Sequence, residues 1–155
     1  MTGRIVPLTE ELVLWAALEE GNPTTMNLAQ IKGWAAQFCA FGTMGGALLD
    51  NGIVCAAGGL VPFWHGRAMA WFMVSPRATR THRMAALKQI RGCLIAAQRH
   101  PEFRRVEMYA RADRALSGER LAGFLGMDFE GTMRGFDPLG RAYHLFARVA
   151  EKEDD

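Results

Sequence analysis

Hydrophobic residues near the N-terminus recur at helical spacing. Leu12, Trp15 and Leu18 lie three residues apart, which predicts an amphipathic helix that Thr9 caps and that runs to about residue 20. Apolar residues at positions 28, 31, 35 and 38 follow a helical pattern too and predict a second helix that opens at Thr25. Residues 4–7, ahead of both helices, predict a short edge strand. The chain is therefore expected to begin with one strand and two helices.

The pattern changes to that of strands after the second predicted helix. Asn51 and Gly52 favour the positive backbone angles of a tight hairpin turn and are preceded by a short apolar segment. Residues 53–61 are almost continuously apolar and predict a buried central strand, in which Gly58 and Gly59 favour a bend. This region is expected to form the centre of a sheet.

The remaining elements alternate between strands and helices. In chain order they are a turn over residues 62–66, a strand over 68–74, a helix over about 82–98, a strand over 105–111, a helix capped by Ser117 that reaches residues 125–126, a strand over 132–136, a turn over 137–140 and a strand over 141–149. This order predicts an α+β fold with a mixed sheet flanked by helices. Because the sequence has no repeat and no linker, we expect a single domain over residues 1–150, followed by an acidic tail over 151–155.

Composition is typical of a soluble protein of the cytoplasm. Half of the residues are hydrophobic and 22% are charged, and no run approaches the ~18 apolar residues of a membrane span. The N-terminal residues lack the apolar core of a secretory signal. Cys39, Cys55 and Cys93 are widely spaced in apolar surroundings, which indicates reduced, buried cysteines rather than a disulfide framework or a metal site.

Positive charge is concentrated in one stretch of the chain, although the net charge is only +2. Between residues 77 and 105 a single acid, Glu102, accompanies eight cationic side chains, which are Arg77, Arg80, Arg83, Lys88, Arg91, Arg99, Arg104 and Arg105. This stretch is a candidate anion site, and the alternative is a solvated basic helix face. Nucleic acid is not the expected partner, because the stretch offers only Phe103 for stacking on bases.

The junction over residues 74–85 is the most informative part of this basic stretch. An apolar strand ends at Val74, and a short polar loop leads into the basic helix. Free backbone amides and the positive end of the helix dipole can hold a phosphate there, and Arg77, Arg80 and Arg83 can add charge-assisted contacts to a pyrophosphate. The loop contains no glycine, although phosphate loops usually use glycine for close approach of the backbone.

Three local motifs make the sequence resemble the GNAT family of acyl-CoA N-acyltransferases, over most of the chain from residue 4 to residue 149. The hairpin over residues 49–60 resembles the family's second and third strands. The helix start is similar to the acyl-CoA motif Q/R-x-x-G-x-G/A, with Arg80 at the first position and Ala85 at the last. Residues 124–131, which include Leu125-Gly126-Met127, resemble the "LGF" turn after the family's last helix.

This resemblance implies a mostly antiparallel central sheet of about six to seven strands, flanked by about four helices, with acetyl-CoA as cosubstrate. The pantetheine arm would lie in a V-shaped opening between the strands over residues 68–74 and 105–111. The backbone of Met73, Val74 and Ser75 would bind this arm. The pyrophosphate would bind a loop made of Arg80, Thr81, His82, Arg83, Met84 and Ala85. An amine would then attack the thioester directly, in a reaction that gains mainly from positioning.

The resemblance marks the catalytic residues less clearly. Arg83 stands at the family's central glycine, and Ala122 stands at the tyrosine that often protonates the departing thiolate. Tyr109, with a packed or rim tyrosine as the alternative, is the candidate substitute. Glu107, with an exposed strand position as the alternative, is the candidate general base. Histidine titrates in the useful range, but structural roles are favoured for all four histidines, which are His65, His82, His100 and His144.

The sequence leaves two functions open. The first is an N-acyltransferase that moves an acetyl group from acetyl-CoA to an amine on a small molecule or a protein. The second, favoured by Arg83 and Ala122, is a GNAT-like protein without catalysis that works by binding or assembly. Residues 59–75 also resemble GNAT-like proteins of tailed bacteriophages, some of which are associated with virion assembly. The expected partners are an acyl-CoA and an amine, with a second copy of the chain or a virion-assembly partner as further possibilities, and no membrane.

Overall fold

The computed structural model describes residues 3–19, 29, 32–33, 36, 45–99 and 103–150. The elements in chain order are β1 (Arg4–Pro7), α1 (Glu10–Glu19), β2 (Gly45–Asp50), β3 (Ile53–Trp64), β4 (Gly66–Val74), α3 (Arg80–Gln98), β5 (Phe103–Arg111), the 3-10 helix η2 (Ala112–Arg114), α4 (Ala115–Leu125), β6 (Asp128–Met133) and β7 (Tyr143–Val149). Most of the predicted second helix lies outside the described residues, as do Cys39, His100 and the acidic tail.

The strands of the described residues form one seven-stranded sheet in the order β1-β2-β3-β4-β5-β7-β6. β4 and β5 pair in parallel, whereas β1 with β2, β2 with β3, β5 with β7 and β6 with β7 pair antiparallel. The predicted α+β fold with a mixed, mostly antiparallel sheet is therefore confirmed. None of the described helices combines the length and the apolar character that a membrane crossing requires.

Contacts within the chain divide it into two compact units. The first unit combines Met1–Val61 with Trp71–Ile90, and the second combines Pro62–Ala70 with Arg91–Asp155. β3, β4 and α3 each contribute residues to both units. The single domain predicted over residues 1–150 stays a prediction.

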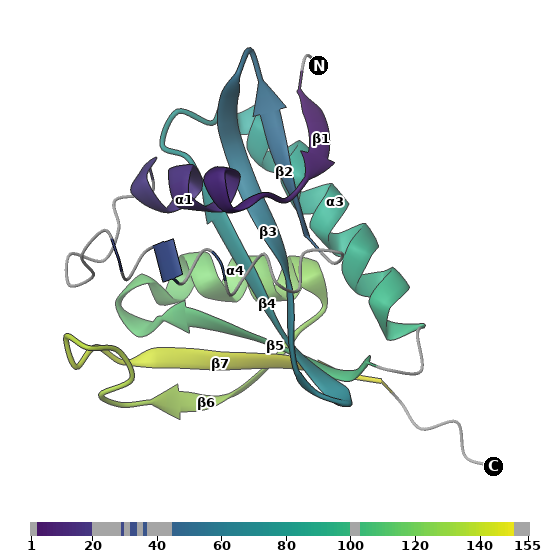
Figure 1. The fold of residues 1–155 in the computed structure, drawn as a ribbon. Coiled ribbons are helices and arrows are strands. Elements are labelled where there is room, and N and C mark those ends of the chain that lie inside the picture. The colour runs from purple at the N-terminus through teal and green to yellow at the C-terminus, as the bar shows by residue number, and fades with distance from the viewer. Residues whose placement is uncertain are drawn as a thin grey trace. The chain divides into compact units, whose positions relative to one another are not determined.

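The first unit is built around the β2–β3 hairpin. Asn51 and Gly52 have φ angles of 50° and 76°, as the predicted tight turn requires. α1 lies on one face of these strands and the start of α3 on the other (Figure 1). The buried side chains on the α3 side come from the hairpin and the α3 region, and are Leu48, Cys55, Ala56, Ala78 and Ala86, with Phe72, Val74 and Ala85 packed against them. This cluster ties the start of α3 to the sheet.

Local signals in the first unit give the expected structures. The backbone N–H of Leu12 donates to Thr9 Oγ1 at 3.3 Å, so Thr9 caps α1 as predicted. A Cβ atom at Gly58 would lie 2.9 Å from the carbonyl oxygen of Trp71, closer than real Cβ contacts come. Glycine at this position of β3 therefore allows the backbone of β4 to approach closely.

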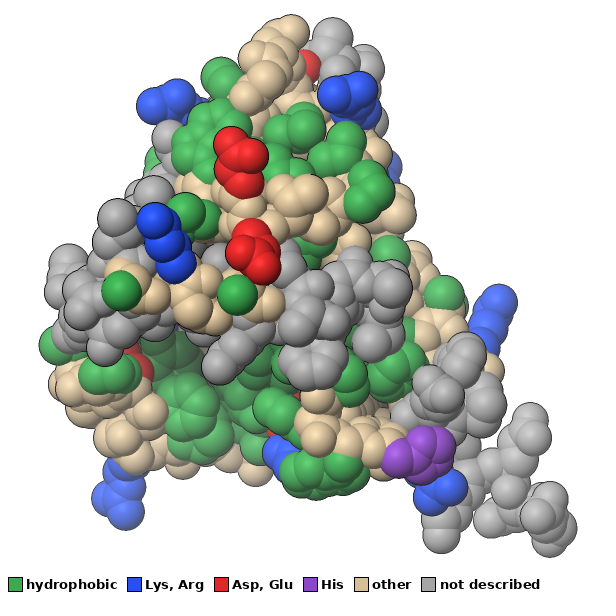
Figure 2. All heavy atoms as spheres, viewed as in Figure 1, with side chains coloured by type: hydrophobic (Ala, Val, Ile, Leu, Met, Phe, Trp, Pro, Cys, Tyr) green, Lys and Arg blue, Asp and Glu red, His purple; other side chains and the backbone are tan. Residues whose placement is uncertain are grey.

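The turn between β3 and β4 is shorter than predicted. β3 continues to Trp64 and β4 begins at Gly66, so the turn expected over residues 62–66 is confined to His65. Gly66 has a φ angle of 89°, which allows so tight a reversal and leaves the preceding residues free to stay in the strand. Phe63 and Trp64 are 43% and 61% exposed, and hydrophobic side chains are visible at this turn in Figure 2.

In the second unit, α4 packs on one face of β5 and β7. A Cβ atom at Gly118 would lie only 2.8 Å from the Cβ of Ala110, so the small residue lets the helix approach the sheet. Ser117 is not the helix cap, contrary to the prediction, because η2 leads directly into α4 at Ala115. Gly126 ends α4 with a φ angle of 71°, in the left-handed conformation common at helix C-termini.

The last two strands are placed differently from the prediction. β6 covers Asp128–Met133 instead of residues 132–136, and β7 begins at Tyr143 instead of Arg141. The reason lies in the connection, where Asp137 Oδ1 accepts hydrogen bonds from the backbone N–H groups of Leu139 and Arg141 at 3.1 and 2.9 Å. These bonds fold residues 137–141 into a compact turn and keep Arg141 out of the strand.

Candidate functional site

Ser75 anchors the loop between β4 and α3. This residue is buried, and its backbone N–H donates to the carbonyl oxygen of Cys55 on β3 at 2.9 Å. Its hydroxyl oxygen accepts from the backbone N–H of Arg77 at 3.1 Å, and its carbonyl oxygen accepts from that of Ala78 at 3.0 Å. The polar atoms of Ser75 therefore hold the loop against the sheet.

Thr79 and His82 cap the start of α3 reciprocally. The N–H of His82 donates to Thr79 Oγ1 at 3.2 Å, and the N–H of Thr79 donates to His82 Nδ1 at 3.2 Å. This is the arrangement of a capping box, with imidazole in place of the usual Glu or Gln. The cap lets α3 begin at Arg80, two residues before the predicted start at His82. The residues expected to form a pyrophosphate loop are thus the first turns of a helix.

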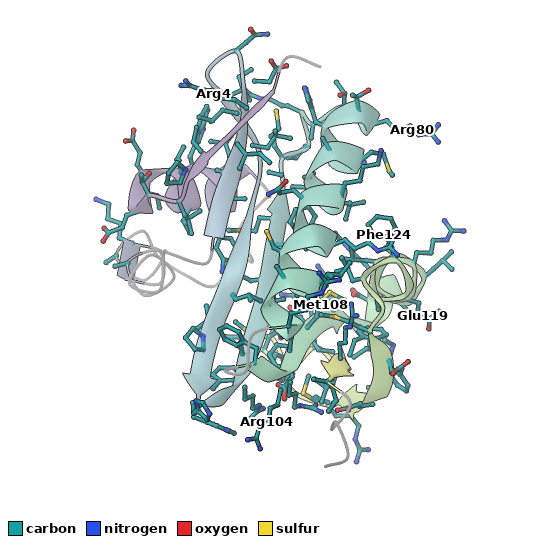
Figure 3. All side chains as sticks on the ribbon, turned by 90° about the vertical axis from the view of Figure 1, so that its right-hand side faces the viewer. Arg4, Arg80, Arg104, Met108, Glu119 and Phe124 are labelled. Carbon is teal, nitrogen blue, oxygen red and sulfur yellow. The ribbon has the colours of Figure 1, made fainter. Side chains whose placement is uncertain are left out.

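This helix start has the features of an anion site. Arg80, Thr81 and Arg83 are exposed there, and Figure 3 shows the Arg80 side chain extending away from the helix. Among the described residues, no hydrogen-bond acceptor is found for the backbone N–H groups of Arg80 and Thr81. Two amides at the positive end of the helix dipole, with guanidinium groups beside them, can bind a phosphate.

The other residues predicted for the cofactor lie close along the chain in the first unit. Met73 is buried and Val74 packs on the buried cluster, so both offer backbone groups rather than side chains. Ala85 also packs on that cluster, whereas Met84 is exposed. Within the motif over residues 80–85, His82 and Ala85 therefore hold the helix in place. The other four residues face solvent, and are Arg80, Thr81, Arg83 and Met84.

A second group of functional side chains surrounds Glu107 on β5 in the second unit. Glu107 is 2% exposed. Arg67 donates to it through Nε and Nη2, at 2.7 Å from Oε1 and 2.9 Å from Oε2. Arg105 Nε donates to Oε1 at 2.6 Å, and the Tyr109 hydroxyl donates to Oε2 at 2.8 Å. Each carboxylate oxygen thus accepts two hydrogen bonds.

These hydrogen bonds set the charge of the cluster. Burial by itself would raise the pKa of Glu107, but the hydrogen bonds from Arg67, Arg105 and Tyr109 together outweigh it and lower the pKa to about 2. The pKa of Tyr109 is raised, first by burial and then by its hydrogen bond to the carboxylate. At neutral pH Glu107 is therefore a carboxylate and Tyr109 a neutral phenol.

Strand register explains how the cluster forms. Arg105, Glu107 and Tyr109 alternate along β5 and so share one face of the sheet, while α4 covers the other. Arg67 lies opposite Arg105 in the parallel β4–β5 pairing, and Glu130 from β6 also binds Arg105, with Nη1 to Oε1 at 2.9 Å. Alternation predicts the three β5 residues, but only strand pairing reveals Arg67 and Glu130.

Tyr109 also packs in a row of aromatic rings. Its ring centroid lies 5.2 Å from that of Phe136, which lies 5.0 Å from that of Tyr143. The ring is thereby held in place while the hydroxyl binds Glu107. This position of Tyr109 is consistent with both interpretations of the residue, as a packed tyrosine and as a catalytic candidate.

The remaining candidates have ordinary surroundings. His65 is exposed in the β3–β4 turn, and His144 packs edge-on against Phe129 with its Nδ1 3.0 Å from Thr132 Oγ1. Ala122, at the family's tyrosine position, is 1% exposed within α4. No group of three metal-ligating side chains occurs in the part of the chain that the structure describes.

Comparison with solved structures identifies proteins with this fold. Ard1 from Thermoplasma volcanium is similar with a TM-score of 0.76 at 14% identity, over 98% of this chain and 100% of that chain. A GNAT-family acetyltransferase from Bacillus anthracis gives 0.67 at 12% identity, over 98% and 97%. YncA from Salmonella typhimurium, solved with acetyl-CoA, gives 0.70 at 11% identity, over 100% and 98%.

Protein-family models and curated protein sequences give no match to the chain. The structural comparison is therefore the one that carries the assignment, and at these identities it speaks for the fold. The chain has the fold of GNAT-family acetyltransferases, as the motifs in its sequence indicated.

Proposed function

We propose that this protein is an N-acetyltransferase that moves an acetyl group from acetyl-CoA to an amine. The observation that carries the proposal is the capped start of α3, where exposed arginines accompany backbone amides of Arg80 and Thr81. A GNAT fold and the acetyl-CoA found with YncA add support. This helix start would bind the pyrophosphate, and the backbone at Met73, Val74 and Ser75 would bind the pantetheine arm.

The bound acetyl-CoA supplies the activated acyl group, and the protein supplies positioning. The amine nitrogen attacks the thioester carbonyl carbon, so a carbon–nitrogen bond forms as the carbon–sulfur bond breaks. The amine loses one proton and the sulfur of coenzyme A gains one. Tyr109 is the proposed relay, because its neutral phenol can give its proton to the thiolate and the phenolate that results can take one from the amine nitrogen.

Glu107 is proposed to position Tyr109. Both of its oxygens already accept two hydrogen bonds, and its pKa of about 2 makes it a weak proton acceptor at neutral pH. These properties favour a role in orienting the phenol over the role of general base that the sequence first suggested.

Titration calorimetry with acetyl-CoA tests cofactor binding. We expect a dissociation constant of about 1 μM or tighter, and at least a tenfold weaker one for the double variant Arg80→Ala, Arg83→Ala (about 1.4 kcal/mol). Lys88→Ala with Arg99→Ala is the matched control, because it removes the same charge from exposed positions away from the helix start. Absence of binding to the wild-type chain at millimolar acetyl-CoA contradicts the proposal.

A second candidate function rests on Arg83 and Ala122. Arginine replaces the motif glycine and a buried alanine replaces the tyrosine, which favours a GNAT fold that binds without turnover. Such a protein would act in assembly with its own copies or, if encoded by a bacteriophage, with virion components in the host cytoplasm. Cys55 is buried as the sequence predicted, whereas Cys93 is exposed on α3, contrary to that prediction.

Turnover separates the two candidates. Thiol release from acetyl-CoA is followed over a panel of small amines and peptides. We expect Tyr109→Phe to keep the wild-type affinity for acetyl-CoA and to lose at least tenfold in turnover. General acid–base groups contribute about 10²–10⁴-fold to the rate. Binding of acetyl-CoA without turnover on any amine would favour the assembly protein.

A further inference from the structure

The start of α3 is tied to a distant turn through the imidazole of His82. Nε2 of His82 lies 2.9 Å from Oδ2 of Asp50, the last residue of β2, and both side chains are 13% exposed. Asp50 immediately precedes the tight turn at Asn51 and Gly52. The two ring nitrogens of His82 thus bind two segments that are far apart in the sequence.

The two hydrogen bonds define which nitrogen carries the proton. Nδ1 accepts the backbone N–H of Thr79, so it has no hydrogen of its own. The ring proton is then on Nε2, which donates it to the Asp50 carboxylate. In this arrangement His82 is a neutral imidazole with one donor and one acceptor, both of them in use.

The Asp50 carboxylate is placed for this single contact. Its Oδ1 atom is buried and has no hydrogen-bond partner among the described residues. A buried carboxylate oxygen without a partner lowers stability, and the Oδ2 bond to His82 offsets part of that loss. The bond to His82 is therefore what holds this carboxylate in place among the described residues.

We propose that His82 and Asp50 are positioning residues that clamp the start of α3 in the conformation that receives the pyrophosphate. The proposal rests on the proposed function of this helix start. Through its two ring nitrogens, His82 links Thr79 to the β2–β3 turn. This link orients the backbone amides of Arg80 and Thr81, which lie between Thr79 and His82 in the sequence. A glycine-free helix start has little freedom to adapt to a ligand, so its amides need to be oriented before binding.

Substitutions at the two positions separate the clamp from an ordinary helix cap. His82→Gln keeps a capping-box side chain for the Thr79 N–H but gives up the bond to Asp50. Asp50→Ala removes the same bond from the other side, whereas Asp50→Asn keeps an oxygen that accepts from Nε2. His65→Gln is the matched control, because His65 is exposed and lies in another turn.

Calorimetry with coenzyme A as the probe gives the main readout. We expect His82→Gln and Asp50→Ala each to weaken binding about five- to tenfold, and the double variant to be no weaker than either, because both break one contact. Asp50→Asn and His65→Gln are expected to stay within about twofold of the wild type. Pantetheine, which lacks the pyrophosphate, is expected to bind all variants alike.

Nitrogen-15 NMR of His82 gives a readout that a loss of folding stability does not imitate. The wild-type ring is expected to show the Nε2–H tautomer, because Nδ1 accepts from the Thr79 N–H, and Asp50→Ala is expected to shift the Nε2 resonance, because it removes the acceptor of the Nε2 hydrogen. Wild-type affinity in His82→Gln, or an Nδ1–H tautomer in the wild type, overturns the clamp. A wild-type chain that fails to bind coenzyme A overturns the proposed function and, with it, the role of the clamp in binding. The NMR spectrum then still shows whether His82 contacts Asp50.

Discussion

The start of α3 and the Glu107 cluster reach their geometry by different routes. At α3, Thr79 and His82 are three residues apart and bind each other. Around Glu107, Arg67 comes from 40 residues away, and Glu130 reaches Arg105 across 25 residues. One region is assembled largely by neighbours in the sequence, and the other by the pairing of β4, β5, β7 and β6.

The two regions also differ in what their hydrogen bonds contribute to stability. Caps at exposed helix ends contribute about 1 kcal/mol. Breaking a buried ion pair costs about 3–5 kcal/mol, because the remaining charge loses its compensation. The comparison therefore predicts a large sensitivity around Glu107 and a small one at the start of α3.

The largest effect is expected when Glu107 itself is removed. Glu107→Ala leaves Arg67 and Arg105 without their shared carboxylate and is expected to lower the free energy of unfolding by about 3–5 kcal/mol. Urea denaturation measures the change. Glu119→Ala, on the exposed face of α4, is the control and is expected to stay within about 0.5 kcal/mol (Figure 3). A loss below about 1 kcal/mol at Glu107 would remove the contrast between the regions.

The pH dependence of the free energy of unfolding tests the same comparison. The pKa of Glu107 is about 2 in the folded chain against an ordinary 4.5, so its stabilisation is present above about pH 4.5 and is lost as the pH falls toward 2. The difference corresponds to about 3 kcal/mol. Urea denaturation of the wild type and of Glu107→Gln across this range checks it. The variant is expected to show a flatter dependence on pH, and parallel curves would contradict the assignment.

Substitutions in α4, which packs on the opposite face of β5, test how much close packing contributes to stability there. Gly118→Ala places a Cβ 2.8 Å from that of Ala110 and is expected to cost about 1–3 kcal/mol through overpacking. Gly123→Ala, in the same helix with no atom within 4 Å, is expected to add about 0.5–1 kcal/mol of stability. Thermal unfolding compares the pair. Equal shifts in both variants would show that close approach at Gly118 is unimportant.

The smallest effect is expected at the cap of α3. Thr79→Ala removes the oxygen that binds the His82 N–H and is expected to cost about 1 kcal/mol. Thr81→Ala, at an exposed position of the first turn, is the control and is expected to stay within about 0.5 kcal/mol. Guanidinium denaturation resolves the two. A cost at Thr79 as large as that at Glu107 would mean that the helix start is not a local structure.

The sequence predicts what depends on near neighbours. The turn at Asn51 and Gly52, the cap at Thr9 and the end of α4 at Gly126 follow from backbone preferences of single residues. Local signals fail where a competing contact is present, as when Asp137 binds the backbone of Arg141 and delays β7. The basic helix start at Arg80 is predicted in the same way, because a helix start and its charges lie within a few residues.

Tertiary structure decides what depends on partners far along the chain. Alternation along β5 places Glu107 and Tyr109 on one face, but nothing in the sequence indicates that Arg67 binds Glu107 or that Asp50 binds His82. Strand register and helix packing select these partners from many equivalent arginines and acids. The fold and the position of the candidate anion site thus follow from the sequence, whereas the lowered pKa of Glu107 and the contact of His82 with Asp50 arise only when distant segments meet, because hydrogen bonds need atoms within about 3 Å.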